Sequence, residues 1–100
     1  MVNGVYSVNE IQDALNPIFQ RAGVRRAVLF GSYAKGIADT RSDVDLLVDS
    51  GLRGLAFFGL LEDVTTALSI PVDLIDVTQI QEGSPIDQEI KLSGVQIFEQ

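Results

Sequence analysis

Two aspartates separated by one residue, Asp43 and Asp45, are the positions in this chain whose type and spacing most clearly suggest chemistry. The segment 43–49 alternates in polarity and predicts a strand. Both carboxylates then emerge on one face, with Cα atoms roughly 7 Å apart. Two unpaired acids there repel each other, and a divalent cation between them removes the conflict. Such a pair suits the two metal ions of phosphoryl transfer, which lie about 4 Å apart.

A third acid, Asp73, interrupts the apolar run 72–77, which predicts another strand. If the two strands are adjacent, Asp73 lies beside Asp45 as a metal ligand or as the base that takes a proton from an acceptor hydroxyl. Each acid also has a simpler interpretation. Asp43 fits a turn cap and Asp73 a solvated edge position, whereas Asp45 is flanked by Val44 and Leu46 and is harder to explain structurally.

A glycine–serine pair, Gly31-Ser32, follows the short apolar run 27–30, which predicts a buried strand. Gly31 lacks the Cβ that would block close approach, and Ser32 adds a hydroxyl donor. A turn that opens a helix presents backbone N–H groups to phosphate, although such a pair after a strand is usually only a turn. Lys35 and Arg41 fit phosphate contacts or solvated side chains equally well.

Composition narrows the chemistry further. The 100 residues include no Cys and no His, which excludes thiol and imidazole catalysis and zinc sites built from those ligands. Carboxylates remain, and these hard oxygen ligands suit Mg²⁺ or Mn²⁺. The net charge of −7 repels phosphate backbones and argues against direct nucleic-acid binding. We expect three further acids, Asp39, Asp49 and Asp76, to lie on the surface.

Hydrophobic periodicity predicts a single α/β (α+β) domain over residues 1–100, with a small mixed central sheet flanked by helices. A helix starts at the capping box of Ser7 and Glu10, is kinked or split at Pro17, and stops at Gly23. A second long helix covers 55–69. A third begins at Ser84-Pro85 and ends at Gly94. The predicted strands are 27–30, 43–49, 72–77 and 95–98.

Together these pieces resemble a known family. Gly31-Ser32, ten intervening residues and then Asp43-Val44-Asp45 match the nucleotidyltransferase signature of the DNA polymerase beta superfamily. The segments 29–36 and 42–48 are similar to its smallest members, the minimal nucleotidyltransferase (MNT) antitoxins of HEPN/MNT toxin–antitoxin pairs. Val72-Asp73-Leu74 resembles the strand that carries their third carboxylate, so the resemblance covers nearly the whole chain.

The resemblance implies roles for the matching positions. Gly31 and Ser32 would hold the triphosphate of ATP, while Asp43, Asp45 and Asp73 would be catalytic and would bind Mg²⁺ (two ions, with Mn²⁺ as the alternative). The implied reaction transfers AMP to a hydroxyl, often a tyrosine, of a cognate HEPN toxin and so neutralises it. An oligomer with the toxin fits this function.

Two other functions remain open on sequence grounds: an antitoxin that masks its toxin by binding alone, and a small-molecule nucleotidyltransferase. The short chain leaves little room for a second substrate domain, which favours an acceptor supplied by a partner protein. Apolar residues on more than one face of the helix 55–69 fit either docking or the core; they are Leu52, Leu55, Phe57, Phe58 and Leu60. No signal peptide or bilayer-length apolar run appears, and we expect a cytoplasmic protein without membrane contact.

Overall fold

The computed structural model describes residue 1 and residues 3–100. The first helix, α1, spans Val8–Ala22 and is closed at both ends as its sequence predicts. Ser7 and Glu10 form the expected capping box, and Gly23 ends the helix in the left-handed conformation, with φ 74°. Pro17 lies inside α1 without dividing it, because the residues on both sides of the proline bury apolar side chains in the same core; these are Ile11, Leu15, Ile18 and Phe19.

Four strands form one mixed sheet in the order β3-β2-β1-β4. The two central strands, β1 (Arg26–Phe30) and β2 (Val44–Asp49), are antiparallel. Strand β4 (Val95–Glu99) runs antiparallel to β1, and β3 (Val72–Asp76) runs parallel to β2. The predicted small mixed sheet is therefore confirmed, and β3 and β4 are its edges.

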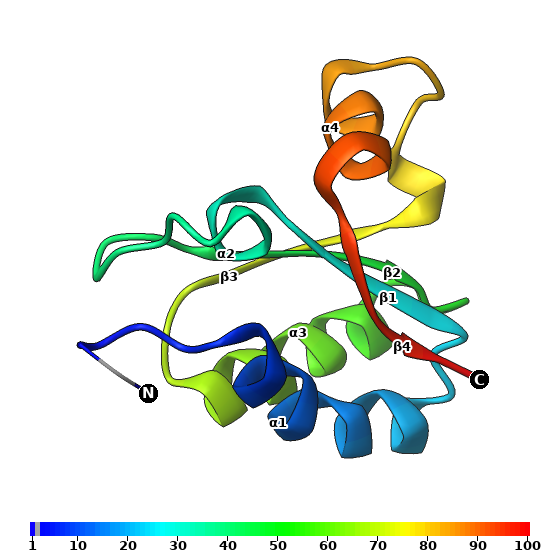
Figure 1. The fold of residues 1–100 in the computed structure, drawn as a ribbon. Coiled ribbons are helices and arrows are strands. Elements are labelled where there is room, and N and C mark those ends of the chain that lie inside the picture. The colour runs from blue at the N-terminus through cyan, green and yellow to red at the C-terminus, as the bar shows by residue number, and fades with distance from the viewer. Residues whose placement is uncertain (2) are drawn as a thin grey trace.

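Helices cover both faces of the sheet (Figure 1). On one face lie α1 and α3 (Leu55–Leu68); on the other lie α2 (Gly31–Lys35) and α4 (Pro85–Ser93). Alternation along β2 divides its residues between these layers. Val44, Leu46 and Val48 enter the main core with α1 and α3, whereas Leu47 joins a smaller cluster on the α4 side.

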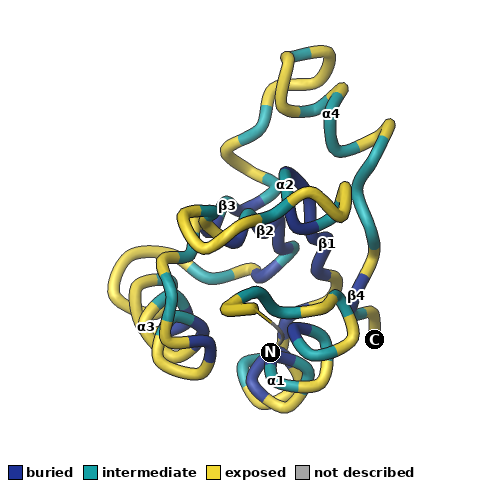
Figure 2. Tube along the Cα trace, turned by 60° about the vertical axis from the view of Figure 1, so that its left-hand side comes forward, coloured by how far each residue is buried: buried dark blue, intermediate teal, exposed yellow. Residues whose placement is uncertain are grey.

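The apolar residues in and just before α3, which the sequence assigned either to the core or to a docking surface, differ in their exposure. Leu60 is buried, Leu52 and Phe57 are half-buried, and Leu55 and Phe58 are 89% and 65% exposed. Figure 2 shows the buried side of α3 turned toward the sheet and its outer side exposed. The helix thus contributes to the core and also leaves apolar side chains in solvent.

Strand β3 is one residue shorter than predicted. After Asp76 the chain turns into a short 3₁₀ helix, η1 (Val77–Gln79), whose N-cap is the Asp76 side chain. An acid that caps a turn ends a strand, and the sequence analysis did not include this alternative for Asp76. None of the helices in residues 1 and 3–100 has the length and apolar character needed to cross a bilayer.

Candidate active site

Asp45 and Asp73 lie side by side on the two parallel strands of the sheet. Asp45 is the register partner of Asp73 in the β2–β3 pair, and on its other side it pairs with Phe30, the last residue of β1. The next residue in the chain, Gly31, begins α2. The sheet therefore brings the glycine–serine turn and two of the three predicted acids to one place, on the face that carries α2 and α4.

Gly31 contacts this acid pair so closely that no side chain fits. Its φ of 74° lies in the left-handed region, and a Cβ built there would overlap the carboxylate of Asp45. Glycine is required for both reasons. The bare backbone at residue 31 leaves Asp45 its place beside the turn, and Ser32 follows as a half-buried residue in the first turn of α2.

The electrostatics of the site show a local excess of negative charge. Burial, followed by the charges of Asp73, Asp43 and Glu89, raises the pKa of Asp45 to about 6. Each of these causes disfavours the ionised carboxylate. A cation would reverse the charge effects, and hard carboxylate oxygens are the donors that Mg²⁺ and Mn²⁺ prefer. The donor set therefore fits a divalent ion.

The third predicted ligand, Asp43, is placed differently from the expectation. It lies one residue before β2, which starts at Val44, and its side chain is exposed. Among the described residues, no three acidic side chains are gathered closely enough to hold a metal ion. The backbone thus places Asp45 and Asp73 together and Asp43 nearby, but the three carboxylates do not form a closed ligand group.

Helix α4 contributes an acid that the sequence analysis did not identify. Glu89 accepts a hydrogen bond from Lys35 at 3.0 Å, which links α4 to the end of α2. Glu89 lies 44 positions after Asp45 in the sequence and belongs to no local motif, so only the packing of α4 reveals that its charge acts on Asp45. Tyr33 packs in the core, at 4% exposed, while Arg41 is exposed.

Asp76 is not the surface acid that we expected. It is 5% exposed, and its two carboxylate oxygens accept four hydrogen bonds from the backbone N–H and hydroxyl groups of Ser50 and Thr78. Burial favours a higher pKa for Asp76, but these donors outweigh burial and hold its pKa below the usual range. Asp76 thus closes the end of the sheet away from Asp45 and has a structural role.

The comparison with protein families agrees with this arrangement. Residues 13–100 match the family described as polymerase beta nucleotidyltransferase. The chain belongs to this nucleotidyltransferase family.

Two curated relatives align with part of the chain. A candidate protein adenylyltransferase of Methanocaldococcus jannaschii is 44% identical over 45 residues, which is 45% of this chain and 48% of that protein. The protein adenylyltransferase MntA of Thermococcus cleftensis is 41% identical over 66 residues, 64% of this chain and 67% of that protein. The chain thus matches about half the length of the first relative.

Solved structures share the fold. A chain in a toxin–antitoxin structure with AMP-PNP superimposes with a TM-score of 0.75 at 24% identity, covering 89% of this chain and 73% of that chain. A chain in the complex of a tri-AMPylated Shewanella oneidensis HEPN toxin with its MNT antitoxin gives a TM-score of 0.68 at 21% identity, covering 90% and 71%. These similarities establish the α+β nucleotidyltransferase architecture.

Proposed function

We propose that this chain is a protein adenylyltransferase that transfers AMP from ATP to a tyrosine hydroxyl of a HEPN-type toxin and thereby neutralises the toxin. The observation that carries the proposal is the pairing of Asp45 with Asp73 directly beside Gly31. The names of the two curated relatives and the toxin–antitoxin structures with the same fold support the choice of nucleotide and acceptor.

The carboxylates of Asp43, Asp45 and Asp73 are the groups that would hold Mg²⁺. When bound, the ion supplies positive charge against the triphosphate and against the charge that develops at the α-phosphate. Because the three acids do not form a closed group in the described chain, we expect the exposed side chain of Asp43 to rotate toward Asp45 as ion and nucleotide bind.

The chain's own residues position the reactants. The bare backbone at Gly31 lets the Asp45 carboxylate lie against the turn, so that a phosphate held at the turn would lie beside the acid pair, and the Ser32 hydroxyl would donate to a phosphate oxygen. The acceptor oxygen then forms a bond to the α-phosphorus while the bond to the β-phosphate bridge oxygen breaks, and pyrophosphate leaves with that electron pair. Asp73, which is exposed at the edge of the sheet, takes the acceptor proton.

Incubation of the chain with Mg²⁺, ATP and its HEPN-type partner tests the proposal by intact mass. We expect the partner to gain mass in steps of one AMP, and Asp45→Asn to reduce the initial rate by at least about 100-fold, in line with the loss of a group that acts on the transition state. Asp49→Asn is the matched control, because Asp49 lies on the same strand and the same face but away from Gly31.

Two results would contradict the proposal. One is the absence of transfer by the wild-type chain with any nucleotide or divalent ion. The other is an Asp45→Asn variant that transfers AMP at the wild-type rate. If Asp45→Asn loses transfer but still neutralises the toxin fully, neutralisation is by masking and the catalytic part of the proposal alone remains.

A further inference from the structure

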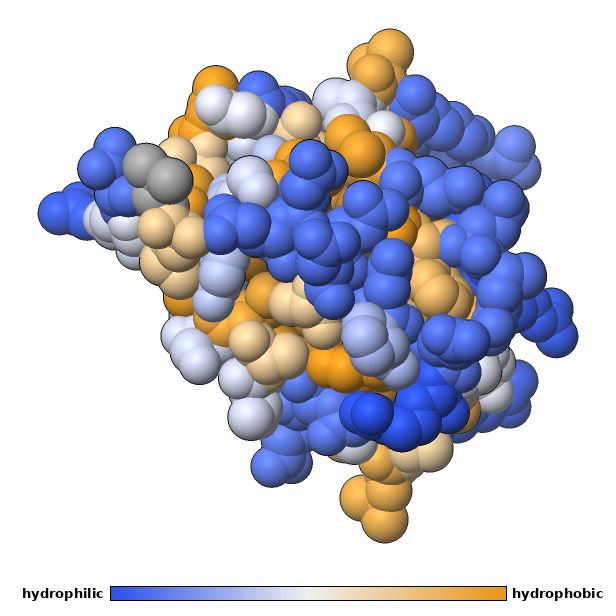
Figure 3. All heavy atoms as spheres, turned by 60° about the horizontal axis from the view of Figure 1, so that its bottom comes forward, coloured by the Kyte–Doolittle hydropathy of each residue, from blue (hydrophilic) through white to orange (hydrophobic). Residues whose placement is uncertain are grey.

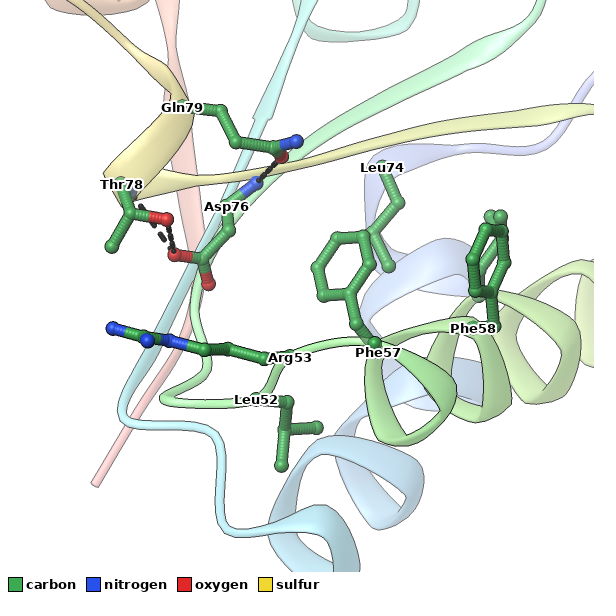
Figure 4. A pocket seen from close by; sticks show the side chains of 10 residues that line it. Leu52, Arg53, Phe57, Phe58, Leu74, Asp76, Thr78 and Gln79 are labelled. Carbon is green, nitrogen blue, oxygen red and sulfur yellow. Dashed lines mark hydrogen bonds between the residues drawn. The ribbon is translucent and has the colours of Figure 1, made fainter.

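A hollow of about 560 Å³ opens between α3, β3 and η1 at the edge of the sheet. Its walls are mainly apolar, from Leu52, Phe57, Leu61 and Leu74, and Arg53 and Asp76 lie at its rim (Figure 4). A volume of this order accommodates one or two large side chains. The hollow lies on the α3 face of the sheet, because Leu74 belongs to the core that packs against α1 and α3, whereas Asp45 and Asp73 face α2 and α4.

The hollow is lined by one negative and one positive side chain, Asp76 and Arg53, and the two differ in what they could offer an occupant. Asp76 is already engaged by four hydrogen bonds, so its acceptors are used. Arg53 is exposed and has no ion-pair partner among the side chains that the structure describes. An occupant that buries an apolar group here gains most if it also brings a carboxylate to the guanidinium, which binds carboxylates through two parallel hydrogen bonds.

The apolar surface continues beyond the hollow. Phe58, which also lines it, is 65% exposed, and Leu55 one turn earlier on α3 is 89% exposed. Figure 4 shows Phe58 standing apart from Phe57 and Leu74. Figure 3 shows hydrophobic side chains that reach the surface between hydrophilic ones on the side formed by α1 and α3. Aromatic side chains beside an arginine are typical centres of protein interfaces.

The hollow and the proposed active site share one strand, β3, and lie on its opposite faces. Strand β3 has no further strand on its outer side within residues 1 and 3–100. Asp73 and Asp76 are three residues apart on it, a separation of roughly 10 Å. A protein that offers a hydroxyl to Asp73 from this open edge would also come within reach of the hollow.

We propose that the hollow is the docking site for the acceptor protein, which inserts a large apolar side chain between Phe57, Phe58 and Leu74 and places a neighbouring carboxylate on Arg53. This inference rests on the proposed function for the identity of the acceptor. The two faces of β3 then have different roles. Asp73 on one face takes part in the reaction, and Leu74 on the other face lies where the partner binds.

The test separates binding from transfer. The dissociation constant of the complex with the HEPN-type partner is measured without nucleotide, and the KM for the partner and kcat are measured with ATP and Mg²⁺. For Arg53→Glu and Phe58→Ser we expect at least about a 10-fold rise in both the dissociation constant and KM, corresponding to about 1.4 kcal/mol. The affinity for ATP and the urea midpoint should stay at wild-type values, since both side chains are exposed.

Leu92→Ser is the matched control, because Leu92 is 88% exposed but lies on α4, away from the hollow; it should bind like the wild type. Arg53→Lys keeps the charge but not the two parallel hydrogen bonds, so its affinity should lie between that of the wild type and that of Arg53→Glu. Raised salt should weaken the wild type more than Arg53→Gln.

The outcomes are distinct from those of the proposed function. If the wild type binds its partner but transfers no AMP, the proposed function fails, and the dissociation constants still decide the docking site. If Arg53→Glu and Phe58→Ser bind and react like Leu92→Ser, the docking site is wrong. It is equally wrong if these variants lose affinity for ATP rather than for the partner, because the hollow then belongs to a small-molecule site.

Discussion

Asp45 and Asp73 are direct register partners across the parallel strands β2 and β3. They are 28 positions apart in the sequence, and α3 provides the connection that makes the strands parallel. The arrangement places two like charges at neighbouring positions on one face, which costs stability in the absence of a cation. Among the register partners of the described strands, two acids face each other at this pair alone, and the pair adjoins Gly31.

Burial of Asp45, together with repulsion by the neighbouring acids, predicts that removal of its charge stabilises the fold. The pKa of Asp45 is raised to about 6, above its unfolded value, so the folded state binds the proton more tightly and stability increases as the pH falls from about 6 toward 4. Above this window the ionised carboxylate destabilises the fold. Two pKa units equal about 3 kcal/mol, which solvent screening of this half-buried group reduces to about 1 kcal/mol.

We therefore expect Asp45→Asn to unfold at higher urea concentration than the wild type at about pH 7 with a chelator present, by about 1 kcal/mol. Near pH 4 the two should be equal within error. Asp49→Asn is again the control and should change little. A variant that is less stable than the wild type at neutral pH would show that the Asp45 carboxylate is paired with a cationic group in the fold.

The neighbours of Asp45 should influence its titration in a definite order. Beyond burial, Asp73 contributes most to the raised pKa, followed by Asp43 and then Glu89. Asp73→Asn should lower the pKa of Asp45 most, Asp43→Asn less and Glu89→Gln least, as measured from the carboxyl carbon resonance during an NMR titration. An equal effect of all three, or the largest effect from Glu89→Gln, would be inconsistent with the strand register.

Gly31 and Gly23 form a natural pair of variants, because both have a φ of 74°. A Cβ meets nothing within 4 Å at Gly23, but at Gly31 it overlaps Asp45. Both alanine variants bear the cost of the left-handed backbone, about 1–2 kcal/mol. We expect Gly31→Ala to lose at least about 1 kcal/mol more, by analogy with overpacked cores, and to lose AMP transfer. Equal unfolding free energies for the two variants would show that the turn moves away from the strand without cost.

Asp76 should matter for stability at the end of the sheet away from Asp45. Asp76→Ala leaves the buried donors of Ser50 and the partly buried donors of Thr78 without their acceptor, and we expect a loss of about 2–4 kcal/mol by urea unfolding. Because its folded pKa is lowered, its contribution is present above the unfolded pKa and is lost as the pH falls through the lower folded value. Asp13→Ala, at an exposed position of α1, should cost no more than about 0.5 kcal/mol. A similar cost for both would mean that water replaces the network.

The elements of this fold could be predicted from sequence where local chemistry determines them. The capping box of Ser7 and Glu10 and the stop at Gly23 fix α1, and the alternation around Asp45 fixes β2. Proximity of Asp45 to Asp73 was expected if the strands were neighbours, and the sheet order confirms that condition. The split considered at Pro17 does not occur, because packing on both sides of the proline holds α1 together as one helix.

The features that the sequence could not reveal depend on contacts between distant segments. Asp76 is polar and follows an apolar run, so its burial depends on Ser50, which lies 26 positions earlier. Glu89 reaches the site only because α4 packs against α2. The hollow at Arg53 depends on the angle at which α3 packs against β3, and the hydrophobic periodicity of the sequence does not determine that angle. In each of these cases the decisive partner lies far away in the chain.

In the proposed function, nucleotide and divalent ion meet where Gly31 joins the Asp45–Asp73 pair, and paramagnetic NMR tests this meeting point directly. Mn²⁺ is added in small amounts together with a non-hydrolysable ATP analogue, and line broadening is mapped along the backbone. We expect broadening centred on residues 31, 45 and 73, with Ile97 on β4 little affected. Broadening centred on Asp76 and Arg53, or spread evenly over the acidic surface, would contradict it.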